Sequence, residues 1–228
     1  MLRRLVLPAL ALLALPGCSD TKVTTDPGAS ASGNLRFVSG VHGAVNVLVD
    51  GTPVLQNVPL GALAGTQVAA GSHSVTIQKV GGVSGVSRSA TFSATGIALV
   101  IGTDSAGAPR PSILLDTNST VPAGATKLRV AHFASGAPTI DVWRTQPDWQ
   151  TPIRLVFPFN YNFTSAYVQS TPGDWRVMIS HPIANVTDPM PDTLANTGLI
   201  PIADGKSRTV IVVDGAVAGT VQLVVVEP

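Results

Sequence analysis

Side chains that commonly bind metals or catalyse reactions are sparse in this chain. Its four histidines lie at positions 42, 73, 132 and 181. No two of them have the short His-x-x-x-His spacing of a zinc site, and the single cysteine, Cys18, lies far from all four. The sequence therefore predicts no metal site and no cofactor.

The acidic residues and serines also lack a catalytic pattern. The segment 188–192 (DPMPD) has neither the alternating oxygen ligands nor the glycine of a calcium loop. No Gly-x-Ser-x-Gly elbow is present to hold a serine nucleophile. His132, Arg129 and Asp141 lie near the ends of neighbouring predicted strands and could converge, but a histidine bonded to a loop carbonyl is the commoner arrangement. We predict that the protein is not an enzyme.

The aromatic residues are distributed unevenly. Every Trp and Tyr lies in the second half of the chain: Trp143, Trp149, Tyr161, Tyr167 and Trp175. Trp149 stands beside Pro147 and Asp148 in a polar segment, which favours an exposed indole that could stack on a sugar ring or anchor a protein partner. We therefore predict a ligand-binding site that includes Trp149, Trp143 and His132.

A second aromatic group occurs from Phe157 to Phe163, where four aromatic residues alternate with Pro and Asn. In an extended strand, alternate residues share one face. Such a stripe either fills a core or forms an exposed platform, and core packing is favoured because a sandwich needs bulky inward side chains.

The first residues read as an export signal. Met1–Gly17 contains Arg3 and Arg4 and then an apolar run, Leu5–Leu15, that is too short to span a bilayer. The junction Leu-Pro-Gly-Cys that ends at Cys18 resembles the bacterial lipobox, in which the cysteine becomes lipidated after cleavage. We predict a signal peptide at 1–17 and a lipidated Cys18. The alternative is an ordinary secreted protein.

The predicted anchor implies a location in the cell envelope. Several acyl chains, at about 0.8 kcal/mol per buried methylene, would hold the protein on the lipid bilayer. Ser19 follows the cysteine, whereas the inner-membrane retention signal has Asp there, so the outer membrane is favoured in a cell with two membranes. Residues 18–33 are polar and rich in turn formers, which predicts a flexible tether.

Length and composition restrict the remaining possibilities. A chain of 228 residues is longer than a typical single domain. Charged residues make up 12% of it, the net charge is +1, and Lys and Arg are scattered, so we expect no nucleic-acid partner.

From Leu35 onward the pattern is that of an all-β protein. Val45, Val47 and Val49 alternate, and the Asp50-Gly51 dipeptide after them predicts a tight hairpin turn. Ile97–Ile101 is continuously apolar, as in a strand covered on both faces.

The order of these segments repeats, which indicates an internal duplication. The matching pairs are Leu35–Val38 with Leu128–Ala131, Val45–Val47 with Ile140–Val142, and Ile113–Asp116 with Val224–Glu227. We predict one β-sandwich domain at 34–117, a linker at 118–126 and a second β-sandwich domain at 127–228, with insertions around 146–151 and 181–197.

The second repeat opens with a motif seen elsewhere. Leu128–His132, Ser135, Ala137-Pro138 and Ile140–Trp143 resemble the opening of a bacterial cell-envelope family known as domain of unknown function forty-three ninety-seven, often found in tandem. The resemblance implies two tandem Ig-like antiparallel β-sandwiches and no established activity. Ser39 stands in the first repeat where the second has His132, so a site based on that histidine cannot occur in both.

Together these observations predict a membrane-anchored envelope lipoprotein with a non-catalytic binding or adhesion role. The second domain would present its loops to a polysaccharide or an envelope protein. The main alternative is a structural or assembly role, in which exposed edge strands pair with like domains. A hydrolase that depends on His132 or Asp141 is the less favoured alternative.

Overall fold

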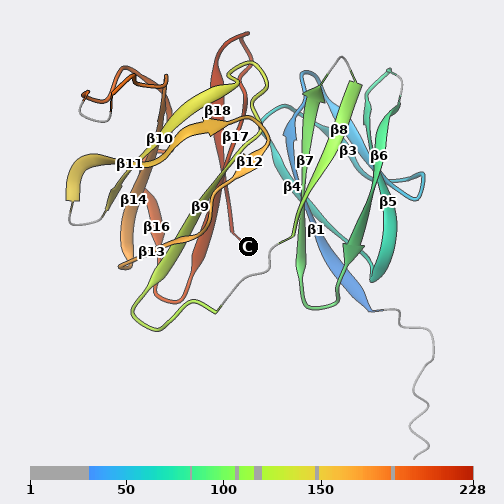
Figure 1. Ribbon diagram of the computed structural model, residues 1–228. Coiled ribbons are helices and arrows are strands. Elements are labelled where there is room, and N and C mark those ends of the chain that lie inside the picture. Colours follow the sequence, from blue (N-terminus) through green and yellow to red (C-terminus); the bar gives the residue numbers. More distant parts are fainter. Residues whose placement is uncertain are drawn as a thin grey trace, which may run out of the picture.

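The computed structural model describes residues 31–82, 84–105, 108–115, 120–146, 149–185 and 188–227. The predicted signal peptide and Cys18 lie outside these residues. Every regular element in the described part is a β-strand, and the strands form two sandwiches side by side (Figure 1). This confirms the predicted fold class. None of the described residues lies in a helix long and apolar enough to cross a membrane.

The first sandwich consists of two four-stranded sheets, ordered β3-β2-β5-β6 and β4-β1-β7-β8. Its strands are β1 (Ser32–Gly40), β2 (Val45–Val49), β3 (Thr52–Val58), β4 (Leu63–Ala69), β5 (Gly71–Lys79), β6 (Ser84–Phe92), β7 (Ile97–Ser105) and β8 (Ala108–Leu115). Alternate residues of β2, namely Val45, Val47 and Val49, point into the core between the sheets, as the sequence pattern predicted.

The second sandwich has sheets ordered β12-β9-β17-β18, with β13 also on β9, and β11-β10-β14-β15, with β16 also on β14. Its strands are β9 (Thr126–His132), β10 (Thr139–Gln146), β11 (Trp149–Asn160), β12 (Phe163–Thr164), β13 (Val168–Ser170), β14 (Gly173–Ser180), β15 (Thr193–Asn196), β16 (Ile200–Ile202), β17 (Ser207–Asp214) and β18 (Val221–Val226). The core includes Leu128, Val130, Trp175 and Ile179.

The hairpin predicted at Asp50-Gly51 is present between β2 and β3. Both residues have positive φ, 51° and 80°, which is the conformation that a two-residue hairpin turn requires. The Asp50 carboxylate accepts a hydrogen bond from the Ser74 amide and lies 2.6 Å from Nδ1 of His73. The contact with His73 is the main reason that the pKa of Asp50 is lowered.

Each sandwich contains one parallel strand pair, whereas the sequence predicted antiparallel sheets throughout. Strand β1 runs parallel to β7, and β9 runs parallel to β17. The two partners are far apart in sequence, and the strands between them complete the other sheet before the chain returns. That long crossover makes parallel pairing possible.

The two sandwiches pack against each other through the faces of the β1–β7 and β9–β17 sheets. Val38, Leu99 and Ile101 of the first sandwich form one buried apolar cluster with Ile211 and Val213 of the second. This explains the continuous apolar run in β7. Ala98 and Val100 face the core of their own sandwich, while Leu99 and Ile101 face the other one.

The predicted aromatic stripe does not lie on one strand face. Strand β11 ends at Asn160, and the chain then turns into β12 of the opposite sheet. A β-bulge between Val156 and Phe159 also breaks the alternation. As a result Phe159 is buried in the core, while Phe157 and Phe163 are 48% and 62% exposed. The stripe is therefore neither a core strip nor a platform as a whole.

Candidate functional site

The three residues considered for a catalytic cluster point in different directions. His132 faces the core of the second sandwich, where its ring lies 5.8 Å from that of Phe159. Arg129 lies three residues earlier on β9, so its side chain is on the opposite strand face, which it shares with interface residue Ala131, and it donates to the Thr209 hydroxyl. Asp141 follows core residue Ile140 on the opposite sheet and therefore lies on its outer face. The structure does not bring these side chains together.

His132 is fully buried and uses both ring nitrogens in structural contacts. Nε2 lies 2.8 Å from the Ala137 carbonyl oxygen, to which it donates, and Nδ1 accepts from the Ala134 amide. Burial lowers the pKa of the ring, so the neutral form is favoured. These contacts match the structural role that sequence reasoning considered for this histidine.

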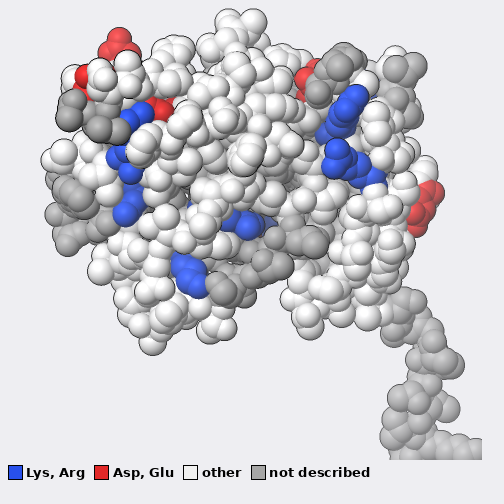
Figure 2. All heavy atoms as spheres, in the orientation of Figure 1, with Lys and Arg blue, Asp and Glu red and all other residues white. Residues whose placement is uncertain are grey.

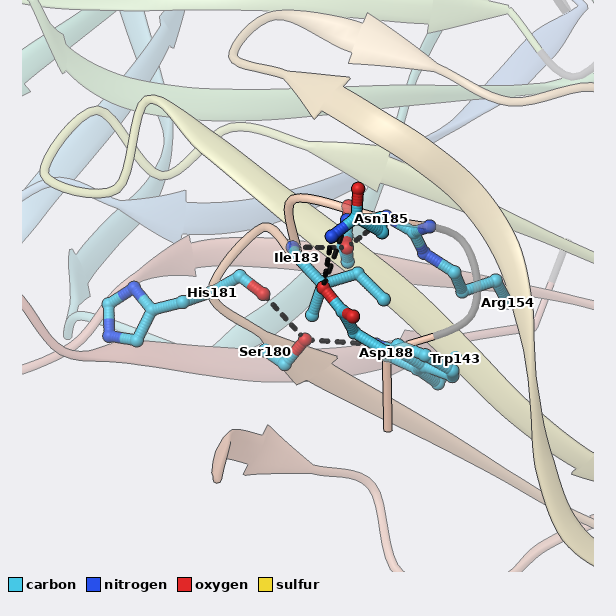
Figure 3. A network of polar contacts seen from close by, with 8 residues as sticks. Trp143, Arg154, Ser180, His181, Ile183, Asn185 and Asp188 are labelled. Carbon is cyan, nitrogen blue, oxygen red and sulfur yellow. Dashed lines mark hydrogen bonds and ion pairs between the residues drawn. The ribbon is translucent and has the colours of Figure 1, made fainter. Parts of the chain in front are cut away.

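The outer face of the β11-β10-β14 sheet carries a buried polar network (Figure 3). The Asp141 carboxylate is fully buried and binds the Arg154 guanidinium at 2.5 Å and the Ile183 amide at 3.0 Å. Ile183 belongs to the predicted insertion at 181–197, so the start of this insertion contacts Asp141. Asn185 and Asp188 are hydrogen-bonded to each other within it.

Trp143, one of the predicted binding residues, belongs to this network. Its indole N–H donates to the Ser180 hydroxyl at 2.9 Å, and the side chain is 6% exposed. The Arg154 guanidinium lies 5.6 Å from the Trp143 ring and 4.1 Å from the Phe157 ring. These contacts tie Trp143 to β14 and β11 and leave little indole surface for a ligand. The side chain of Trp149 lies outside the described residues.

A different site is present where the two sandwiches meet. A cavity of about 300 Å³ is lined by His42 and Asp104 from the first sandwich and, in the second sandwich, by the β9–β10 loop, the end of β17 and the β17–β18 loop. The residues from the second sandwich are Ser135, Gly136, Asp214, Val217, Ala218, Gly219 and Thr220. We call this cavity the junction pocket.

Asp214 organises the junction pocket. Its carboxylate is 6% exposed and accepts hydrogen bonds from the Ser135 amide, the Ser135 hydroxyl at 2.8 Å and the Gly136 amide at 2.8 Å. The Ser135 hydroxyl also lies 3.5 Å from the main-chain oxygen of Asp104, so this loop contacts both sandwiches. Asp104 itself is paired with Lys79 at 2.7 Å.

The arrangement in the junction pocket favours binding over acyl transfer. A nucleophilic serine needs a base that takes its proton, and imidazole is the usual one. Ser135 donates to Asp214 instead, and among the described residues it has no hydrogen bond to His42. The described residues also contain no cluster of three His, Cys, Asp or Glu side chains that could hold a metal ion.

Residues 33–143 match the model of one protein family, "Domain of unknown function (DUF4397)". The matched segment is a DUF4397 domain. It covers the first sandwich except Ser32 at the start of β1 and extends through β9 into β10, and it confirms the resemblance seen in the sequence. The match assigns no activity to these residues, and a second tandem copy of the DUF4397 domain stays a prediction.

Comparison with other proteins adds little about function. No curated protein matches the chain. Among solved structures, it is similar to a leucine-rich repeat protein from Bacteroides thetaiotaomicron VPI-5482 (12% identity, 79% of this chain and 26% of that one, TM-score 0.21). It is also similar to the Bacillus anthracis TIE protein (11% identity, 81% of this chain and 34% of that one, TM-score 0.26). A third similar structure, titled for alpha-glucan binding, is that of a streptococcal virulence factor (11% identity, 78% of this chain and 92% of that one, TM-score 0.24). The chain spans about a quarter of the length of the leucine-rich repeat protein and about a third of the length of the TIE protein.

The junction pocket was not predicted from the sequence. Asp104 and Asp214 lie at the ends of the corresponding strands β7 and β17, and Ser135 is part of the motif that resembles the family. The packing of one sandwich on the other brings Asp104 beside the Ser135 loop, and the sequence alone does not show that packing.

Proposed function

We propose that this protein is a lipid-anchored, non-catalytic binding protein of the bacterial cell envelope that recognises a polysaccharide in the junction pocket. The observation that supports this most is the junction pocket itself, which two apolar-packed sandwiches build jointly. A site that spans a fixed interface is presented in one geometry, which lowers the entropic cost of binding.

The chemistry of the junction pocket suits a ligand rich in hydroxyl groups. Asp214 and Asp104 supply carboxylate oxygens, Ser135 and Thr220 supply hydroxyls, and His42 is exposed at the rim. The carboxylate oxygens accept hydrogen bonds, and the hydroxyls both donate and accept them, so together they can pair with the hydroxyl groups of a sugar. The face shown in Figure 2 carries only separated spots of Lys and Arg or of Asp and Glu, so it offers no broad charged patch to attract a nucleic acid.

The proposal is tested by calorimetric titration of the protein with envelope polysaccharides. The His42→Ala variant removes an exposed side chain at the rim, so we expect the variant to fold normally and to bind more weakly. The Trp149→Ala variant tests the prediction made from sequence. Loss of binding only in Trp149→Ala would move the site to that residue. If no polysaccharide binds and the protein self-associates, the assembly role replaces this proposal.

The anchor is a separate part of the proposal and rests on the lipobox-like sequence that ends at Cys18. We propose that Cys18 is acylated, that residues 34–117 and 127–228 form domains joined by a linker at 118–126, and that the protein resides at the outer membrane of a cell with two membranes. Radiolabelled palmitate should label the protein, and Cys18→Ser should abolish the label. Labelling that persists in Cys18→Ser would contradict the proposed anchor.

A further inference from the structure

A second cavity, of about 450 Å³, lies on the first sandwich alone, between β1, β4 and the start of β7. Arg36 lies in its lining, together with the polar residues Asn34 and Gln67 and the apolar residues Leu63 and Ile97. Within the part of the chain that the structure describes, Arg36 has no ion pair, hydrogen bond or ring contact. We call this cavity the Arg36 groove.

The second sandwich has a counterpart of Arg36, and this counterpart is covered by an aromatic ring. Leu35 corresponds to Leu128, so Arg36 corresponds to Arg129 on β9. The Arg129 guanidinium lies 4.6 Å from the centre of the Tyr167 ring, a cation–π distance. The Tyr167 hydroxyl is also 3.4 Å from that of Thr209.

The first sandwich has a glycine where the second has this tyrosine. On β4, Thr66 pairs with Leu35 and Gly65 pairs with Arg36. On β13, Val168 pairs with Leu128, so Tyr167, the residue before it, lies opposite Arg129 as Gly65 lies opposite Arg36. Because Gly65 has no side chain, the volume that Tyr167 fills in one sandwich is open in the other.

We infer that the Arg36 groove binds an aromatic side chain of a partner polypeptide, with a tyrosine ring stacked on the Arg36 guanidinium. Leu63, which is 39% exposed, and Ile97 provide apolar contact for the ring edge. The amides of Asn34 and Gln67 can hydrogen-bond a phenol hydroxyl. A guanidinium over a ring face is attractive in itself, and more so when it is partly desolvated.

The position of the Arg36 groove favours a polypeptide as the source of this ring. Among the described strands, β4 pairs only with β1 and forms the edge of its sheet (Figure 1). An edge strand has unpaired main-chain N–H and C=O groups that can bind an extended segment, while alternate side chains of that segment enter pockets on the sheet face. The Arg36 groove is such a pocket, beside the edge.

The test uses the full chain in detergent, with labelled Leu and Ile methyl groups observed by NMR. The probes are N-acetyl-tyrosinamide, a short extended peptide with one central Tyr, and the same peptide with Ala in place of Tyr. We expect ring-current shifts at Leu63 and Ile97 with both tyrosine probes and none with the alanine peptide. Arg36→Gln should weaken binding by about tenfold.

Two further variants use the internal comparison. Gly65→Tyr should fill the Arg36 groove from within and abolish the shifts. A Cβ at Gly65 would lie 3.4 Å from its nearest neighbour, the Leu35 carbonyl oxygen, and φ at Gly65 is not left-handed, so the backbone at this position accommodates a Cβ. Tyr167→Ala should remove the ring that covers Arg129 and open an equivalent site there. The tyrosine probes should then shift a second set of methyl signals, from the second sandwich.

Three results would overturn the inference. One is equal shifts in the normal chain and in Arg36→Gln. Another is binding of the tyrosine and alanine peptides with the same affinity. The third is a response to polysaccharide alone, at Leu63 and Ile97, with none to the tyrosine probes. Because these shifts are read at β4 and β7, the outcome is independent of binding in the junction pocket.

Discussion

Because the two sandwiches pack against each other, we expect a cavity-forming substitution in the first sandwich to destabilise the second sandwich. Leu99 on β7 is 3% exposed and belongs to the apolar cluster that joins the sandwiches. Leu99→Ala removes side-chain volume from this cluster without touching the cores of either sandwich. A buried Leu→Ala substitution costs about 3 kcal/mol. We therefore expect the interface to lose a large part of its contribution to stability.

This effect can be measured with a signal that comes only from the other sandwich. All three tryptophans, Trp143, Trp149 and Trp175, lie in the second sandwich. Their fluorescence during urea unfolding therefore reports on that sandwich. With a denaturant slope of about 2 kcal/mol per molar urea, a loss of about 3 kcal/mol lowers the midpoint by about 1.5 M.

The control is Val86→Ala, a substitution of a first-sandwich valine that is 45% exposed and outside the interface. It should change the midpoint by less than about 0.3 M, because exposed substitutions usually change stability by under about 0.5 kcal/mol. If Leu99→Ala leaves the tryptophan transition unchanged while the far-UV signal, to which both sandwiches contribute, gains an earlier transition, the two sandwiches unfold independently. The expected coupling across the interface would then be wrong.

Three more predictions concern the second sandwich and the hairpin. Because the pKa of buried His132 is lowered, the unfolded state binds a proton more readily than the folded state. The free energy of unfolding should therefore be full above about pH 6.5 and fall as the pH decreases below that value. Urea titrations at several pH values should show a flatter dependence for His132→Gln. Asp141→Ala leaves the buried Arg154 guanidinium without its carboxylate and should cost about 3 kcal/mol, measured by chemical unfolding; a cost below about 0.5 kcal/mol would contradict the role of the pair. Gly51→Ala forces a positive φ on alanine and should lower stability by about 1 kcal/mol, whereas an unchanged unfolding midpoint would show that the turn relaxes.

Local patterns were sufficient for the first hairpin and for strand β7 of this protein. The alternation at Val45, Val47 and Val49 identified an inward face, and Asp50-Gly51 identified its turn, because strand period and turn geometry are properties of neighbouring residues. The apolar run in β7 correctly indicated cover on both faces. These inferences need no knowledge of the distant chain.

Tertiary structure decided what covers each face and which groups meet. The alternation from Phe157 to Phe163 failed because a β-bulge and a change of sheet redirect the chain, and both depend on pairing with β10 and β9. His132 and Asp141 were visible as candidates, but the sheet faces they occupy separate them.

Neither cavity could be inferred from the sequence alone. The junction pocket exists because Leu99 packs on the second sandwich, which brings Asp104 beside Ser135. The Arg36 groove exists because Gly65, and not an aromatic residue, lies opposite Arg36 across the strand pair. Sequence order sets the period and propensity of each strand, whereas contacts between residues far apart in the chain depend on register and packing, which only the folded structure fixes.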